Sequence, residues 1–485
     1  MENSTKLSKV VYGVLLTQIQ FGAYRRGDKL PTIEETGARL HVSVATARDA
    51  YLKLKEEGYI TLSKNVGATV IVNYSDRETE EFIQTFFALR KNAMLDLDSS
   101  LQPLLGNARW IGLKHASEHT LQAMEDLLRQ EGTPAPWAML EYLEQTYGAF
   151  GNRLLIRLVW QSFMFLYAPF FSLGENLRCF DRFADYLPEV TALCRRQDWP
   201  GLRAAADRSM DRLSAALGRF CTSRITSLPP EEEIAFPWSS YQKSRQRCYS
   251  FAMELLISIS RGAYPAGSLL PSQTELAEQR GVSVSTVRRA LELLRGIGAI
   301  KSARYVGTRV IPLDKTTENS DFSKPVLQRR LLDMVESIQI FALSCKEVSL
   351  LTLTRLEAGA IGELCGELKE QKLLRRGDVL SYFLLGRLAK HAPYQAIRTV
   401  YTELLRQFFW AYALRGMEGS QEEINARYDP HIDGLIGALE EEDFVRFSAR
   451  LEELMIYELR TTVGMLSQLR IPGAENMLLP DESGS

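Results

Sequence analysis

One segment of this sequence occurs twice, and the second copy follows the first at a distance of 240 residues with no insertion. Residues 22–70 and 262–310 are identical at 19 of 49 positions. A repeat that is this long and occurs only twice indicates a duplicated domain arrangement, because solenoids are built from more numerous and shorter units. A chain of 485 residues is long enough for two to four domains.

Three helices and a hairpin are predicted for each copy. In the first copy, apolar spacing and turn residues predict helices over 12–19, 33–40 and 44–57. Ser43 is placed to cap the third of these helices. Short apolar and β-branched runs over 59–62 and 69–72 predict a small hairpin. This order of elements is that of a winged helix-turn-helix, whose third helix enters the major groove of DNA.

The motifs of both copies resemble the DNA-binding domain of GntR-type bacterial regulators. They are Gly-x-Tyr-x-x-Gly-x-x-Leu-Pro, Val-Ser-x-x-Thr-x-Arg-x-Ala, Gly-x-Ile and Val-Gly-x-x-Val. The resemblance implies a dimer that binds a near-palindromic operator of double-stranded DNA. Carried over by position, the implied DNA contacts are Ser43, Thr46, Arg48 and Gly67 in the first copy, and Ser283, Thr286, Arg288 and Gly307 in the second.

Two positions depart from the family pattern in both copies. Val44 and Val284 stand where arginine usually follows the Val-Ser pair. Glu34 and Thr274 replace a common basic residue at the start of the second helix. Arginine is the commonest side chain that recognises guanine edges. We therefore expect an operator that differs from the usual one of the family.

The two copies also differ from each other at positions that would face DNA. Asp49 would repel a phosphate where Arg289 attracts one, and the wings carry Lys64 and Arg304. We therefore add Lys64, Arg289 and Arg304 to the candidate DNA contacts. Two unlike recognition helices predict an asymmetric operator, since only identical helices favour a palindrome.

The net charge of −2 is distributed unevenly along the chain. Residues 1–74 hold 10 basic and 7 acidic side chains, whereas residues 239–312 hold 11 basic and 4 acidic ones. The rest of the chain has 37 basic and 49 acidic side chains. Two basic modules in an otherwise acidic chain are typical of a protein whose phosphate contacts are confined to those modules.

A region with helical periodicity and almost no strand signal follows each module. Helices are predicted over 77–97, 116–129, 137–147, 154–167, 177–197 and 200–222, and then over 328–344, 349–371, 378–389, 394–414, 424–440 and 444–469. Residues 154–160 correspond to residues 395–401, so the duplication extends into these regions. They are similar to the ligand-sensing helical bundle of the FadR-type branch of GntR regulators.

The predicted fold is therefore mainly α, with two winged helix-turn-helix (α+β) domains that alternate with two all-α bundles. The expected domains are a winged module at 1–74, a bundle at 75–237, a winged module at 238–314 and a bundle at 315–485.

Neither a metal nor another cofactor is expected. The resemblance implies a metal in many such bundles, held by one aspartate and three histidines. This chain has five histidines in all, and His41 lies in the helix-turn-helix, which leaves two for each bundle. His115 and His119 could share a helix face and bind zinc, but a third ligand is lacking.

The bundles offer candidates for a site that binds a small metabolite. A pocket for an organic acid would place arginine beside an apolar lining. The candidates are Arg153, Arg157 and Trp160 in the first half and Glu357, Arg398 and Tyr401 in the second. The alternative is that these residues serve packing or ion pairing between helices and bind no ligand.

Cysteine usage and the start of the chain predict a cytoplasmic location. The six cysteines form no Cys-x-x-Cys pair, and residues 1–10 are polar, unlike a signal peptide. The apolar stretch 154–173 contains Arg157, Gln161 and Pro169, so we expect a buried helix rather than a membrane span.

The function predicted from these features is that of a bacterial transcription regulator whose single chain carries both halves of a dimer. DNA binding would then need no oligomer, although one could still form. One alternative is a ligand-insensitive architectural DNA-binding protein. Another is a regulator fused to an aminotransferase-like domain that holds pyridoxal phosphate on a lysine. That domain needs an uninterrupted α/β fold, which the second winged module would interrupt, so we expect no enzyme.

Overall fold

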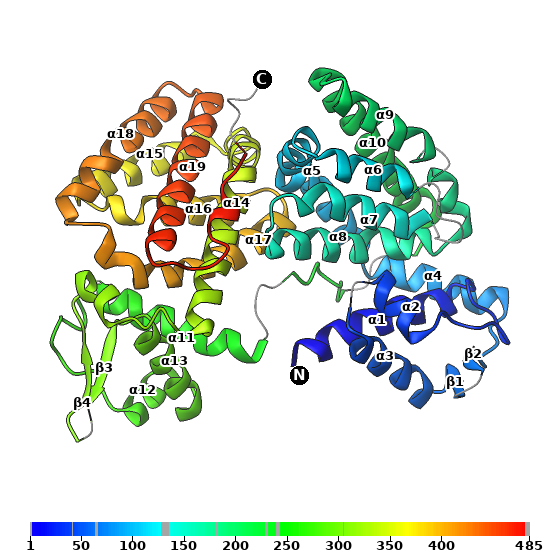
Figure 1. Cartoon of the computed structure of the whole chain (residues 1–485), viewed down its shortest axis with the longest axis horizontal. Helices are drawn as coiled ribbons and strands as arrows, with labels where there is room; N and C mark the ends of the chain where they lie inside the picture. The colour runs from blue at the N-terminus through cyan, green and yellow to red at the C-terminus, as the bar shows by residue number, and fades with distance from the viewer. Residues whose placement is uncertain are drawn as a thin grey trace. The chain divides into compact units, whose positions relative to one another are not determined.

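The computed structural model of the chain describes residues 2–40, 42–63, 66–127, 135–180, 183–227, 231–238, 243–260, 262–303 and 305–480. Within these residues the secondary structure is mainly helical, with two antiparallel two-stranded sheets (Figure 1). The predicted fold class, winged helix-turn-helix modules combined with helical domains, is confirmed.

The chain forms two compact units. The first comprises Met1–Gln102, Ala108–Ala149 and Ile156–Pro237, and the second comprises Pro103–Asn107, Phe150–Leu155 and Trp238–Ser485. Each unit contains one winged module and most of one helical bundle.

The winged module of the first unit has the predicted order of elements. They are α1 (Glu2–Gln20), α2 (Ile33–Arg39), α3 (Val44–Glu56), β1 (Ile60–Ser63) and β2 (Gly67–Val70). The strands pair with Ile60 opposite Val70 and Ser63 opposite Gly67. α1 begins well before the predicted 12–19. The sequence does not indicate this earlier start, because the mostly polar residues there show no apolar period.

A tyrosine fixes α3 to the start of α2 in this module. The fully buried Tyr51 of α3 donates its hydroxyl to the carbonyl of Pro31 at 2.6 Å. The same hydroxyl lies 2.8 Å from the Thr36 hydroxyl on α2. Burial raises the pKa of Tyr51 to about 12, so the hydroxyl stays protonated at neutral pH. These hydrogen bonds fix the angle between the two helices.

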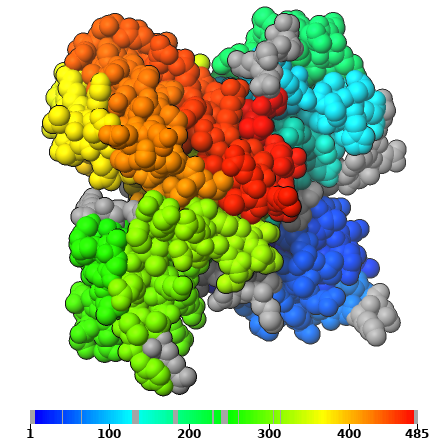
Figure 2. Space-filling model, turned by 60° about the vertical axis from the view of Figure 1, so that its left-hand side comes forward, coloured from blue at the N-terminus to red at the C-terminus, as the bar shows by residue number. Residues whose placement is uncertain are grey.

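The second unit repeats the winged module. Its elements are α11 (Lys243–Ser260), α12 (Gln273–Arg280), α13 (Val284–Gly296), β3 (Ile300–Ala303) and β4 (Gly307–Val310). The register is that of the first copy, with Ile300 opposite Val310 and Ala303 opposite Gly307. The hairpin projects from the helices of its module in the space-filling view (Figure 2). Leu291, which is buried, occupies the position of Tyr51, so apolar packing replaces the tyrosine hydrogen bonds here.

The first bundle follows its module as a series of helices. They are α4 (Asp76–Ala88), α5 (Lys91–Lys114), α6 (Glu118–Asp126), α7 (Ala135–Gly148), α8 (Arg153–Phe171), η1 (Gly174–Phe180), α9 (Phe183–Arg195), α10 (Trp199–Arg219) and η2 (Phe220–Arg224). The predicted helix over 77–97 is in fact two helices, and α5 continues through Pro103. The predicted helix over 177–197 is divided between η1 and α9.

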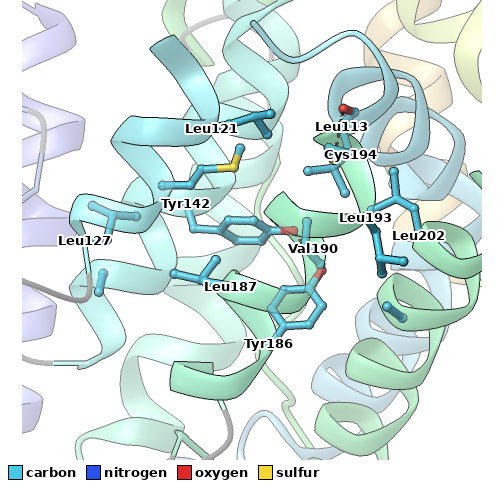
Figure 3. Close-up of a cluster of buried hydrophobic side chains, with 13 residues drawn as sticks. Leu113, Leu121, Leu127, Tyr142, Tyr186, Leu187, Val190, Leu193, Cys194 and Leu202 are labelled. Carbon is cyan, nitrogen blue, oxygen red and sulfur yellow. Dashed lines mark hydrogen bonds between the residues drawn. The ribbon is translucent and has the colours of Figure 1, made fainter. Parts of the chain in front are cut away.

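Apolar side chains from α5, α6, α7, α9 and α10 form one core cluster of this bundle (Figure 3). Within it the hydroxyls of Tyr142 and Tyr186 lie 2.8 Å apart and satisfy each other. The Cys194 thiol lies 3.5 Å from the carbonyl of Leu113. Burial raises the pKa of Cys194 to about 11, so this cysteine is an unreactive core residue.

The second bundle has a similar order of helices. They are η3 (Leu313–Lys315), η4 (Thr317–Asn319), α14 (Pro325–Leu353), α15 (Ala358–Leu373), η5 (Gly377–Val379), α16 (Leu380–His391), α17 (Gln395–Leu405), η6 (Arg406–Met417), α18 (Gln421–Glu440), α19 (Phe444–Gln468) and η7 (Glu475–Met477). α14 packs along α19 at the centre of the bundle. α14 is longer than the predicted 328–344, and the predicted helix over 394–414 is divided into α17 and η6.

Within the part of the chain that the structure describes, α8 is the one helix long and apolar enough to cross a membrane by length and composition. Of its apolar window, 78% is buried inside the protein. This burial agrees with the prediction of a core helix over 154–173.

Candidate nucleic-acid interface

Ser43 begins the recognition helix of the first module. Its hydroxyl oxygen accepts a hydrogen bond from the backbone N–H of Thr46 at 3.1 Å, as predicted for an N-cap. The Thr46 hydroxyl lies 2.8 Å from the Ser43 hydroxyl, and Thr46 is buried. Thr46 therefore positions the start of α3, whereas the exposed Ser43 remains accessible to a phosphate.

Arg48 is exposed one turn into α3 and forms no hydrogen bond or ion pair with any residue that the structure describes. Asp49 beside it is also exposed. A guanidinium without an intramolecular partner keeps its donors for an external acceptor. Phosphate oxygens and the acceptors of guanine in the major groove are acceptors of this kind.

The recognition helix of the second module is capped in the same way. The Ser283 hydroxyl accepts from the Thr286 N–H at 3.2 Å and lies 2.9 Å from the Ser285 hydroxyl. Arg288 and Arg289 are both exposed, and neither is paired with a residue in the described ranges. The second module thus presents two adjacent guanidinium groups where the first presents an arginine and an aspartate.

An apolar residue is exposed at the first position of each recognition helix. Val44 is 41% exposed and Val284 is 45% exposed. These are the positions where the family pattern usually has arginine. A branched apolar side chain offers no donor to guanine, but it can contact the methyl group of thymine in the major groove.

The helix that precedes each recognition helix starts with a capping box. The Thr32 hydroxyl accepts from the Glu35 N–H, and the Glu35 carboxylate accepts from the Thr32 N–H at 2.7 Å. Ser272 and Glu275 make the same pair of bonds in the second module. The hydrogen bond from the Thr32 backbone lowers the pKa of Glu35, so this box is intact at neutral pH.

Each wing turns at a glycine with positive φ. The φ of Gly67 is +86° and that of Gly307 is +110°, a region that favours glycine, and both residues are exposed. A Cβ atom would meet nothing within 4 Å at Gly67 and would only touch Leu269 at Gly307. The backbone conformation, not crowding, therefore requires glycine. The candidate contacts Lys64 and Arg304 lie outside the described residues.

The effector candidates of the first half take separate positions. The buried Trp160 of α8 donates its indole N–H to the carbonyl of Leu40 at 3.2 Å. Leu40 is the C-cap of α2, so this bond connects the bundle to the helix-turn-helix. Arg153 is exposed, and Arg157 is half-buried.

The candidates of the second half serve local structure. The fully buried Tyr401 has its hydroxyl 2.9 Å from that of Ser344. Arg398 donates to the carbonyl of Ala392 at 2.5 Å and so holds the turn between α16 and α17. Glu357 is exposed at the N-cap of α15. Nothing in the described structure brings these candidates together with a common ligand site.

No group of three or more His, Cys, Asp or Glu side chains could hold a metal ion among the residues described. His115 is the C-cap of α5, whereas His119 lies in α6, so the two belong to different helices. His41 lies outside the described residues.

The family model of the bacterial regulatory proteins of the gntR family matches the chain twice, at residues 7–70 and 251–310. Both winged modules belong to the GntR family. The chain is thus a tandem duplication of GntR-type modules, as the repeat and its motifs predicted.

Comparison with individual proteins gives partial matches. An uncharacterised helix-turn-helix-type transcriptional regulator of Escherichia coli K12, YieP, is 38% identical over 78 residues, which cover 16% of this chain. The match spans about a third of YieP, 34% of its length.

Three solved structures share low identity with this chain. A GntR protein of Streptococcus agalactiae is 20% identical over 44% of this chain and 99% of its own, with a TM-score of 0.22. McbR/YncC of Escherichia coli is 16% identical over 44% of this chain and 96% of its own, with a TM-score of 0.21. Lar, described as controlling expression of the Listeria monocytogenes agr system, is 16% identical over 47% of this chain and 99% of its own, with a TM-score of 0.22.

Proposed function

We propose that this protein is a sequence-specific, DNA-binding transcription regulator of the cytoplasm in which one chain supplies both recognition modules. The observation that carries this proposal is the exposed recognition face, which occurs in both copies. In each copy a capping serine begins the helix and an unpaired arginine follows one turn later. GntR-family membership of both modules supports the same function. The proposal includes no enzymatic step.

The proposed operator has two unequal half-sites. The exposed Arg288 and Arg289 of α13 favour closer phosphate contact than the Arg48 and Asp49 pair of α3. Because the modules are joined covalently, binding of the second half-site is intramolecular and needs no second chain. An oligomer is compatible with this arrangement but is not required for it.

The helical bundles are proposed to bind a small metabolite that changes operator affinity. The hydrogen bond from Trp160 to the C-cap of α2 is a physical contact through which the first bundle can act on its recognition module. A ligand-insensitive architectural role is the alternative, and it predicts that no metabolite changes operator affinity.

The test is a selection from a randomised pool of double-stranded DNA with the full chain. We expect enrichment of one operator whose two half-sites differ in sequence, and light scattering should find one chain on the minimal operator. A pool that shows no enrichment would refute sequence-specific binding. A perfect palindrome, or two chains on one minimal operator, would refute the single-chain asymmetric arrangement.

A further inference from the structure

The second unit contains a hollow of about 390 Å³ between its winged module and its bundle. Its walls come from α11 of the module and from α16, α17 and η6 of the bundle. Small-ligand sites in proteins occupy about 300–1,000 Å³, so the hollow is large enough for a metabolite of modest size.

Each helix contributes one face to the hollow. On α11 the lining residues are Tyr249, Ser250 and Met253, and on α16 they include Tyr382, Gly386 and Lys390. Tyr249 and Met253 lie four residues apart, as do Tyr382, Gly386 and Lys390 in turn, so each set shares one side of its helix. The hollow is therefore formed by the packed faces of regular helices.

Gly386 leaves open space at the centre of the α16 face. A Cβ atom built at this glycine would meet nothing within 4 Å. The residue has helical backbone angles, so glycine is not required by the conformation of α16. Glycine costs about 1 kcal/mol relative to alanine inside a helix. Because Gly386 also lines the hollow, this open space is available to a ligand.

The charge of the lining points to an anionic ligand. Lys390 is exposed at the end of α16 and pairs with no residue in the described ranges. Arg406 also lines the hollow, but its guanidinium is bonded to the Glu403 carboxylate. The ammonium group of Lys390 thus remains without an intramolecular partner in a lining that also contains Thr402, while Phe409 and the two tyrosines provide aromatic surface.

Occupation of the hollow would act on the recognition helix. α11 packs directly against α13 within the module. On its other side, Tyr249 of α11 meets the ring of Trp410 edge to face at 6.0 Å. A ligand bound beside Tyr249 and Met253 would shift α11 relative to the bundle. Because α11 packs against α13, the recognition helix would shift with it.

We propose that this hollow is a regulatory site for a small amphipathic carboxylate with an aromatic or aliphatic body. The carboxylate pairs with Lys390, and the apolar body lies over Gly386 against Phe409. This inference rests on the proposed regulatory function for its effect on DNA, but ligand binding itself can be measured without DNA.

The experiment uses the full chain and 4-phenylbutyrate as the probe, with 4-phenylbutanol as its uncharged counterpart. Calorimetric titration is made on the wild type, on Gly386→Phe, and on Lys390→Gln. Gly366→Phe serves as the matched control, because Gly366 is an exposed glycine of α15 that also has open space around a Cβ and does not line the hollow.

We expect 4-phenylbutyrate to bind the wild type and Gly366→Phe with equal affinity. Gly386→Phe should weaken binding at least tenfold, because the new ring fills the hollow. Lys390→Gln should bind the acid and the alcohol equally. Equal binding by Gly386→Phe and wild type, or no binding to the wild type at millimolar concentration, would overturn the proposal.

Operator affinity of the same proteins is measured separately in the absence of the probe. If the probe binds as expected but the protein binds no operator, the result supports the ligand site and contradicts the proposed function. If the operator is bound but the Gly386 substitution leaves probe binding unchanged, the proposed function stands and this site fails.

Discussion

Replacement of Arg288 by alanine tests whether α13 contacts DNA as proposed. Arg288 is exposed and has no partner among the described residues, so its removal breaks no intramolecular ion pair. Surface substitutions of this kind change the free energy of unfolding by about 0.5 kcal/mol or less. A change of this size leaves the protein folded, so a loss of operator affinity in the variant reports a lost contact with DNA.

The expected loss of binding free energy is about 1–3 kcal/mol, the range for one arginine contact with a base edge. At 25 °C this corresponds to a roughly 5- to 150-fold increase in Kd. Fluorescence anisotropy with the selected operator measures it. Arg48→Ala in α3 should give a loss in the same range.

A salt series separates the two kinds of contact that Arg288 could make. If the guanidinium binds a phosphate, the slope of log K against log salt should fall by about one unit in the variant. If it binds a base edge, the slope should stay unchanged and discrimination at one base pair should be lost. Arg77→Ala is the control, since Arg77 is an exposed arginine of α4 outside both modules. Affinity within twofold of the wild type for both Arg48→Ala and Arg288→Ala would refute the reasoning.

Three further predictions follow from single side chains. Val284→Arg should shift the preferred base at one operator position from thymine to guanine, as a repeated selection with the variant would reveal; an unchanged preference there would mean that Val284 faces no base. Trp160→Phe removes the N–H donor to Leu40 and should destabilise the first module by about 1 kcal/mol, with faster amide hydrogen exchange in α2; unchanged exchange would show that the bond carries no coupling. Burial raises the pKa of Glu418 to about 7, above that of an unfolded chain, so the folded protein binds a proton that the unfolded chain has lost between about pH 5 and 7. Stability contributed by this group should therefore fall as pH rises through that window, and Glu418→Gln should flatten the pH profile of denaturant unfolding; a profile identical to that of the wild type would contradict this.

The winged modules could be predicted well because their sequence carries local signals. The capping serines, the glycines of the wings and the periodic apolar residues each determine the structure over a few neighbouring positions. The sequence does not mark the start of α1, because residues 2–10 are mostly polar and show no apolar period.

The bundles were predicted less accurately because their boundaries depend on packing. The helix is interrupted at Leu89 and Arg90, between α4 and α5, although the apolar pattern continues through these residues. η6 follows α17 without any proline or glycine to mark the change. Sequence alone does not distinguish Trp160, which donates to the C-cap of α2, from Tyr401 at the corresponding position, which bonds within the core. The hollow beside Gly386 forms where α11 meets α16, α17 and η6, which lie far from α11 in the sequence, and no short motif marks it.

The separate recognition faces of α3 and α13 have a genetic consequence. In a homodimer, one codon specifies both recognition helices, so a substitution that improves one half-site also alters the other. Here Asp49 and Arg289 are encoded separately, and either can mutate while its counterpart keeps its existing contacts. A regulator built in this way can acquire new target sites through a sequence of single substitutions, each of which changes only half of the DNA that the protein recognises.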